Sequence, residues 1–199
     1  MDLAEVSRYE PVEVDGTARE AAVLVPVFCR DREPWLLFTK RAEHLGEHPG
    51  QMSFPGGGRE PVDGTLRATA LREAGEEIGL RPEEPTVVGR LDDIETVSGY
   101  AVRPFVARIP DREYYPDEYE VAEIAPLPVA GLTDRGNYES QRREHPRHGD
   151  VCLHFFHVNG YTVWGATARM LVQFLELTTD WNVPPEPDHV VDEDAEYPV

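Results

Sequence analysis

Three glutamates, Glu73, Glu76 and Glu77, stand close together after a glycine-rich stretch, GGGREPVDG, at positions 56–64. On an α-helix, at about 100° per residue, Glu77 lies about 40° from Glu73 and Glu76 about 60° to its other side, so the three share one strip. Carboxylate oxygens suit Mg²⁺ or Mn²⁺, which take further ligands from water and from phosphates. The spacing therefore indicates a divalent-cation site. The alternative is a solvated acidic face, because 38 Asp and Glu outnumber 19 Lys and Arg.

The residues around the glutamates predict a helix of about fourteen residues. Thr65 can cap its start, and Gly79 followed by Pro82 ends it. Like charges three and four residues apart cost a few tenths of a kcal/mol per pair, and Gly75 in mid-helix costs up to about 1 kcal/mol against Ala. These features are unfavourable for a purely structural helix, which favours a functional role for the carboxylates. The predicted apolar side consists of Leu66, Ala70, Leu71, Ala74 and Ile78.

The segment Arg72-Glu73-Ala74-Gly75-Glu76-Glu77-Ile78-Gly79-Leu80 resembles the second half of the Nudix box, and the preceding glycines resemble its first half. The family pattern is G, five residues, E, seven residues, then R-E-U-x-E-E-x-G-U, where U is apolar. This chain has Asp63 in place of the first Glu, and eight residues (64–71) rather than seven separate it from Arg72. This lengthening resembles some coenzyme A-directed members. It leaves the role of Asp63 open and the REAGEE core intact.

The stretch before the box, LLFTKRAEHLGEHPGQMSFPGG at 36–57, resembles the element that marks coenzyme A diphosphatases among Nudix enzymes. That element runs approximately LLTxRSxxLRxHxGxxxFPGG. This chain departs from it at Ala42, where the pattern has Ser, and at Gly46, where it often has Arg. The segments VRPFVA (102–107) and VWGATA (163–168) resemble the same subgroup. The resemblance runs from Val23 to Leu177.

The resemblance implies a role for each matching residue. Glu73 and Glu77 would be the principal ligands of Mg²⁺ or Mn²⁺, with Glu76 as a further ligand. Gly57 would offer its carbonyl oxygen to a metal. Arg72 would hold the loop and the helix together through an ion pair.

An acidic residue from outside the box helix is also implied, and Glu120 is the candidate, with Glu118 and Glu123 as alternatives. The general base is left open between Glu73 and Glu120. The loop before the box would bind the phosphates or the pantetheine arm of a substrate. Its candidate substrate-binding residues are Lys40, Arg41, His48 and Gly50.

Apolar and alternating runs predict strands along the chain, and an amphipathic pattern predicts a second helix at 165–177. The resemblance implies an α/β (α+β) fold, a Nudix-type α/β/α sandwich with a mixed central β-sheet. We expect an N-terminal arm (1–18), one Nudix hydrolase domain (19–179) and an acidic, proline-rich, disordered tail (180–199). Segment 132–150, rich in arginine and histidine, is expected to be a mobile flap. The predicted strands are 21–29, 35–39, 86–94, 102–109, 120–127, and 151–158 with 161–164 around the turn Asn159-Gly160.

The net charge of -19, with Lys40 as the single lysine, argues against a nucleic-acid polymer as partner. Molar salt screens repulsion of this kind, so the composition favours a salt-rich cytoplasm, the alternative being an ordinary acidic cytosolic protein. Cys29 and Cys152 lie in apolar runs and are expected to be buried, reduced thiols. No segment is apolar enough for a membrane helix, so a cytoplasmic protein is expected. The sequence is compatible with a homodimer.

Three hypotheses on function follow. The first is hydrolysis of coenzyme A or its derivatives to 3',5'-ADP and 4'-phosphopantetheine. The second is the same chemistry on ADP-ribose, NADH or a dinucleoside polyphosphate. The third is a non-catalytic ligand-sensing domain, which the intact Glu73, Glu76 and Glu77 disfavour. Fold alone does not decide among them.

Overall fold

The computed structural model describes residues 1–14, 19–45, 49–145, 149–192, 195 and 197. His48 and Gly46 lie outside these residues. The elements along the chain are α1 (Ala4–Arg8), β1 (Arg19–Arg30), β2 (Glu33–Arg41), β3 (Met52–Ser53), β4 (Gly56–Gly58), α2 (Leu66–Ile78), β5 (Thr86–Arg90), β6 (Ile94–Glu95), β7 (Tyr100–Arg108), β8 (Val121–Pro128), α3 (Val129–Leu132), η1 (Arg135–Asn137), β9 (Tyr138–His145), β10 (Gly149–Val158), β11 (Tyr161–Val163), α4 (Gly165–Thr178) and β12 (His189–Val191).

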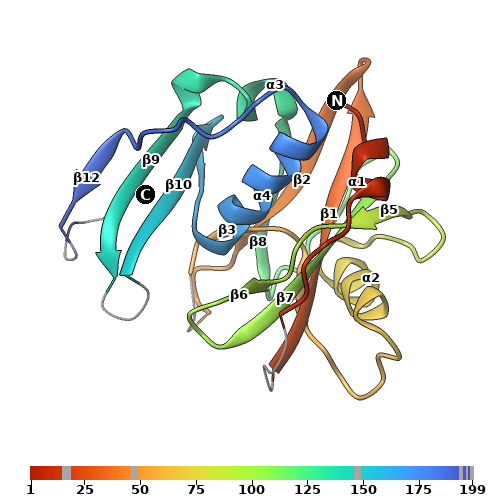
Figure 1. The fold of residues 1–199 in the computed structure, drawn as a ribbon. Helices are drawn as coiled ribbons and strands as arrows, with labels where there is room; N and C mark the ends of the chain where they lie inside the picture. The colour runs from red at the N-terminus through yellow and green to blue at the C-terminus, as the bar shows by residue number, and fades with distance from the viewer. Residues whose placement is uncertain (15–18, 46–48, 146–148, 193–194, 196, 198–199) are drawn as a thin grey trace.

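The central sheet has the order β3-β2-β1-β7-β5, and β4, β6 and β8 pair with β1, β7 and β2 respectively (Figure 1). β1 and β7 run parallel while the other pairs are antiparallel, so the sheet is mixed. Alternation along β1 sends Leu24 and Phe28 to the face covered by α2, and Val25 and Val27 to the face covered by α4. The expected α/β/α layering with a mixed sheet is confirmed.

The segment after β8 is ordered differently from the expectation. β9 and β10 form a hairpin in a second sheet of order β11-β10-β9-β12, where a mobile flap was predicted at 132–150. That prediction is wrong for the described part of the segment, because β9 satisfies its backbone groups by pairing with β10. The charged side chains of β9 concealed the strand. The hairpin of β10 and β11 at Asn159-Gly160 is confirmed, with φ of 54° and 83° at its two turn residues.

Part of the C-terminal segment packs onto the domain, so the prediction of a disordered tail is wrong for residues 180–192. Trp181 is only 7% exposed. The Asp188 carboxylate accepts hydrogen bonds from the Ser140 amide and hydroxyl, both at 2.8 Å. β12 then adds a parallel strand to the edge of β9. β12 is ordered because β9 offers it an open edge for pairing. The local sequence of the tail does not reveal that edge.

The N-terminal arm is also attached more firmly than expected. Helix α1 packs against β5 and α4, and Val6 on the helix and Leu3 just before it are 1% and 5% exposed. Tyr9 then donates its hydroxyl to the Asp92 carboxylate at 3.0 Å and accepts a bond from Gln173 of α4 at 3.0 Å. The expected loose lead-in is therefore a docked segment over its described residues 1–14.

Both cysteines are free, as expected, but Cys29 and Cys152 are exposed rather than buried. Each lies toward an exposed end of its strand, Cys29 one residue before the end of β1 and Cys152 in the less buried first half of β10. In the part of the chain that the structure describes, no helix is long and apolar enough to cross a membrane.

Candidate active site

Helix α2 begins and ends where its sequence predicts. The Thr65 hydroxyl oxygen accepts a hydrogen bond from the Ala68 amide at 3.1 Å, and Gly79 takes a left-handed conformation with φ of 64°. The helix buries Ala74 and Ile78 against the sheet. These contacts fix the rotation of α2 and so determine where the three glutamates emerge.

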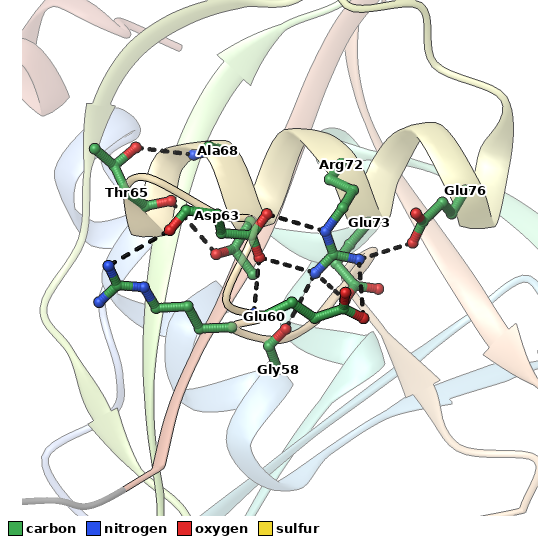
Figure 2. A network of polar contacts seen from close by, with 10 residues as sticks. Gly58, Glu60, Asp63, Thr65, Ala68, Arg72, Glu73 and Glu76 are labelled. Carbon is green, nitrogen blue, oxygen red and sulfur yellow. Dashed lines mark hydrogen bonds and ion pairs between the residues drawn. The ribbon is translucent and has the colours of Figure 1, made fainter.

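The loop before α2 is joined to the helix by Arg72 and Asp63 (Figure 2). Arg72 donates from Nε to Asp63 Oδ1 and from Nη2 to Asp63 Oδ2, both at 3.0 Å, and from Nη2 to the Gly58 carbonyl at 3.2 Å. The guanidinium holds the pKa of Asp63 well below its usual range. Such a two-point pair fixes direction as well as distance, so the loop and the helix are locked together. The ion pair expected of Arg72 is present.

Asp63 is the site residue whose role the sequence left open. Although the box is one residue longer than the standard pattern, Asp63 is 6% exposed and faces Arg72. A turn from Glu60 to Asp63 orients this carboxylate, because the Asp63 amide donates to the Glu60 carbonyl and the Glu60 amide donates to Asp63 Oδ2, both at 2.9 Å. An Asp that closes such a turn just before a helix cap is the signal that could have revealed this.

Glu73 lies against the glycine loop. A Cβ at Gly57 would stand 2.6 Å from the Glu73 carboxylate carbon, so a side chain there would displace this carboxylate. Glu73 also pairs with Arg72 Nη2 at 2.9 Å. Burial raises its pKa, and the Arg72 charge opposes that increase. The Glu73 carboxylate is thus held beside the Gly57 backbone. This is the arrangement expected if Glu73 and the Gly57 carbonyl bind the same cation.

Glu77 is the most buried of the three box glutamates, at 6% exposure. Its one described hydrogen bond comes from the Gly56 amide to Oε2 at 3.3 Å. Burial, followed by the negative charge of Glu73, raises the pKa of Glu77 to about 8, with Glu120 raising it further and Arg41 opposing. Burial and the charges of Glu73 and Glu120 therefore outweigh the opposing charge of Arg41 at Glu77.

Glu76 and Glu120 are the remaining acidic candidates for the site around Glu73 and Glu77. Glu76 is 59% exposed and pairs with Arg72 Nη1 at 2.8 Å. Glu120 accepts a backbone bond from Ala42 at 2.9 Å, and its charge raises the pKa of both Glu73 and Glu77. Among the alternatives to Glu120, Glu123 instead accepts a hydrogen bond from the Tyr161 hydroxyl.

The loop of the predicted substrate residues closes beside Glu120. The Arg41 amide donates to the Gln51 carbonyl at 3.0 Å, and the Gly50 amide donates to the Arg41 carbonyl at 3.2 Å. Alternation along β2 places Lys40 on the face of Phe38 and α4, where its ammonium lies 3.9 Å from Glu43. The structure thus brings Arg41 near Glu77 and turns Lys40 toward the other face.

The donor set fits a divalent cation. Across residues 1–14, 19–45, 49–145 and 149–192, no three His, Cys, Asp or Glu side chains are arranged at ligand distances. Arg72 holds Glu73 and Glu76, while Glu77 lies under the Gly56 amide. However, Glu77 is a buried carboxylate next to like charges, and burying an unpaired charge is costly. Mg²⁺ and Mn²⁺ prefer oxygen ligands, so either cation would offset the negative charge of these carboxylates.

Comparison with known proteins gives the family. Residues 18–126 match the NUDIX domain, which spans more than half of the chain. The chain belongs to the Nudix family. It is 41% identical over 157 residues to a Nudix hydrolase of Enterobacter sp. (strain 638), called uncharacterized Nudix hydrolase NudL, covering 77% of this chain and 79% of that protein. A NudL protein of Cronobacter sakazakii is 43% identical over 158 residues, with the same coverage.

Solved Nudix structures are more distant. A MutT/nudix family protein from Enterococcus faecalis is 16% identical, with a TM-score of 0.49 over 80% of this chain and 59% of that one. The NUDIX domain of Shewanella oneidensis NrtR, solved with ADP ribose, is 18% identical, with a TM-score of 0.48 over 65% of this chain and 84% of that one. At these values the likeness carries no argument about substrate.

Proposed function

We propose that this Nudix hydrolase cleaves the pyrophosphate linkage of coenzyme A or its derivatives, giving 3',5'-ADP and 4'-phosphopantetheine, with Mg²⁺ or Mn²⁺ as cofactor. The observation that carries the proposal is the position of the loop resembling the coenzyme A element. Within it, the Ala42 amide donates to the Glu120 carbonyl, and the charge of the neighbouring Arg41 acts on Glu77. A substrate phosphate bound by this loop would therefore meet the carboxylates of the box.

Each residue of the site would have its own role in the hydrolysis. Glu73 and Glu77 would hold the cation, with Glu76 as a further ligand once released from Arg72, and with the Gly57 carbonyl beside them. When bound, the cation neutralises phosphate charge and acidifies water. Glu73 or Glu120 would accept the proton of the attacking water. Arg41 would bind and orient the pyrophosphate oxygens.

Arg72 and Asp63 would act as positioning residues. Their two-point ion pair keeps the glycine loop at a fixed distance from α2. Catalysis by positioned groups is sensitive to small displacements, and about 1 Å can cost on the order of 100-fold. We therefore assign this pair to the geometry of the site rather than to contact with substrate.

The second candidate function is the same hydrolysis of ADP-ribose, NADH or a dinucleoside polyphosphate. One observation favours it, namely that Gly46 stands where the coenzyme A element often has Arg. A lost guanidinium would weaken recognition of an additional phosphate. Gly46 lies outside the described residues, so a substrate comparison decides between the two.

The test is a panel of coenzyme A, acetyl-coenzyme A, ADP-ribose, NADH and diadenosine polyphosphates, assayed at low and molar KCl with Mg²⁺ or Mn²⁺. We expect coenzyme A to give the highest kcat/KM. Cleavage of ADP-ribose at least tenfold better, about 1.4 kcal/mol in transition-state stabilisation, would reject the coenzyme A assignment and leave the Nudix chemistry in place.

A further inference from the structure

Outside the carboxylate site, four side chains form a continuous stack on the second sheet. The Phe155 ring is fully buried and stacks on Trp164, with centroids 6.3 Å apart and planes 13° apart. The ring centroids of Tyr197 and Trp164 are 4.9 Å apart. The central carbon of the Arg143 guanidinium lies 4.3 Å from the centroid of the Tyr197 ring. Trp164 and Arg143 together, called here the stacking pair, therefore hold one aromatic ring.

Arg143 has an unusual environment for a cation. It is 4% exposed, and its Nη atoms donate to neutral oxygens, at 3.0 Å to the Ala195 carbonyl and at 3.0 Å to Gln141 Oε1. Its Nε is buried without a hydrogen-bond partner among the described residues, and no described ion pair joins it to a carboxylate. A buried charge without a counter-charge is costly, so this guanidinium is suited to a π system or an anion that arrives from outside.

The stacking pair lies next to the substrate loop. Gly165, which follows Trp164, approaches Gln51 so closely that a Cβ there would stand 3.3 Å from Gln51 Nε2. The Gln51 carbonyl accepts a bond from the Arg41 amide at 3.0 Å, and the charge of Arg41 reaches Glu77. A ligand that extends along these residues would run from the stacking pair to the carboxylates.

We propose that Trp164 and Arg143 hold the nucleobase of the substrate, in the place that the ring of Tyr197 takes in this structure. The inference rests on the proposed action on a nucleoside diphosphate compound. Indole rings and guanidinium groups both stack on nucleobases, and the Phe155 contact fixes the plane of the indole in advance. The free Nε of Arg143 would be available to a base acceptor or to a phosphate on the ribose. Tyr197 then competes with the base.

The test is calorimetric titration in EDTA, with ADP as probe and inorganic pyrophosphate as the probe without a base. If Tyr197 fills the site most of the time, Tyr197→Ala should tighten ADP binding about three- to tenfold and leave pyrophosphate binding unchanged. Trp164→Leu should weaken ADP binding about tenfold, or about 1.4 kcal/mol, whereas Trp164→Phe should keep it. Arg143→Met, checked for folding by circular dichroism, should weaken ADP binding as well. In hydrolysis assays, Tyr197→Ala should lower KM without changing kcat.

ADP binding within twofold of the parent in both Tyr197→Ala and Trp164→Leu would overturn the assignment of the stacking pair. The same experiments distinguish failure of the base site from failure of the proposed hydrolase function. If ADP binding responds as expected but no compound of the panel is cleaved, the base site stands and the hydrolase assignment falls. If a nucleoside diphosphate compound is cleaved with a KM that these variants do not move, the base site falls and the hydrolase assignment stands.

Discussion

Glu77→Gln should make the metal-free protein more stable, and the gain should grow with pH. In the folded chain burial and the charge of Glu73 raise the pKa of Glu77 from 4.5 to about 8. Below pH 4.5 this carboxyl is protonated in both folded and unfolded chains and costs nothing. Between pH 4.5 and 8 the unfolded chain releases the proton first, so folding stability falls as pH rises. Above pH 8 the folded chain carries the full cost of a buried charge.

The size of the effect follows from the same values. One pKa unit corresponds to about 1.4 kcal/mol, so the interval from 4.5 to about 8 amounts to a few kcal/mol as an upper range. Gln has nearly the volume of Glu and can still accept the bond from the Gly56 amide. The gain of the variant over the parent should therefore be near zero at pH 4.5 and reach a few kcal/mol at pH 8.5.

The assay is urea unfolding in EDTA at several pH values, for the parent, Glu77→Gln and Glu76→Gln. Glu76 is 59% exposed on the same helix, so its variant controls for loss of a box carboxylate without burial. Adding Mg²⁺ should stabilise the parent and leave Glu77→Gln unaffected, because a ligand that binds only the folded state raises its stability. A gain that is flat between pH 5 and 8.5, or a Glu77→Gln protein less stable than the parent at pH 8.5, would refute this reasoning.

Three further predictions concern the loop, the substrate and the surface. Asp63→Asn should lower Tm at pH 6, and the difference from the parent should shrink as pH falls toward 3. The reason is that Arg72 holds the pKa of Asp63 low, and a stabilising contribution of this kind is present above its unfolded pKa of 3.8 and lost in acid. Thermal scans against pH, with Glu60→Gln as control, test it. Arg41→Ala should reduce kcat/KM roughly tenfold, about 1.4 kcal/mol, with Mg²⁺ affinity by calorimetry unchanged; weakened Mg²⁺ binding would place Arg41 in the metal site instead. The net charge of -19 predicts a Tm that rises between about 0.1 and 2 M KCl, as the Debye length falls from about 10 Å to near 2 Å. A Tm independent of KCl would argue against adaptation to salt.

Local signals in the sequence were sufficient where a single residue decides the conformation. Thr65 and Gly79 set the ends of α2, and Asn159-Gly160 set the hairpin of β10 and β11. Each acts through its own backbone or a neighbour a few residues away. The box helix and its glutamates could therefore be predicted from the sequence alone.

Long-range contacts explain what the sequence did not predict. β12 has three residues and exists because β9 offers an open edge, and Asp188 reaches Ser140 from 48 positions away. The charges of segment 132–150 predict a mobile flap, yet Arg143 is buried under Tyr197. Glu76 lies in the same sequence strip as Glu77, but Arg72 holds it in a more exposed position.

The central claim is that water cleaves a pyrophosphate bond with the help of a cation held by Glu73 and Glu77. The most direct measurement is the hydrolysis of coenzyme A in ¹⁸O-labelled water with Mg²⁺, with all products identified by mass spectrometry. The account predicts equal amounts of 3',5'-ADP and 4'-phosphopantetheine, one ¹⁸O in only one of the two, and no turnover in EDTA or with Glu77→Gln. Equal rates in EDTA, or release of inorganic phosphate with dephosphorylated coenzyme A as the product, would contradict it.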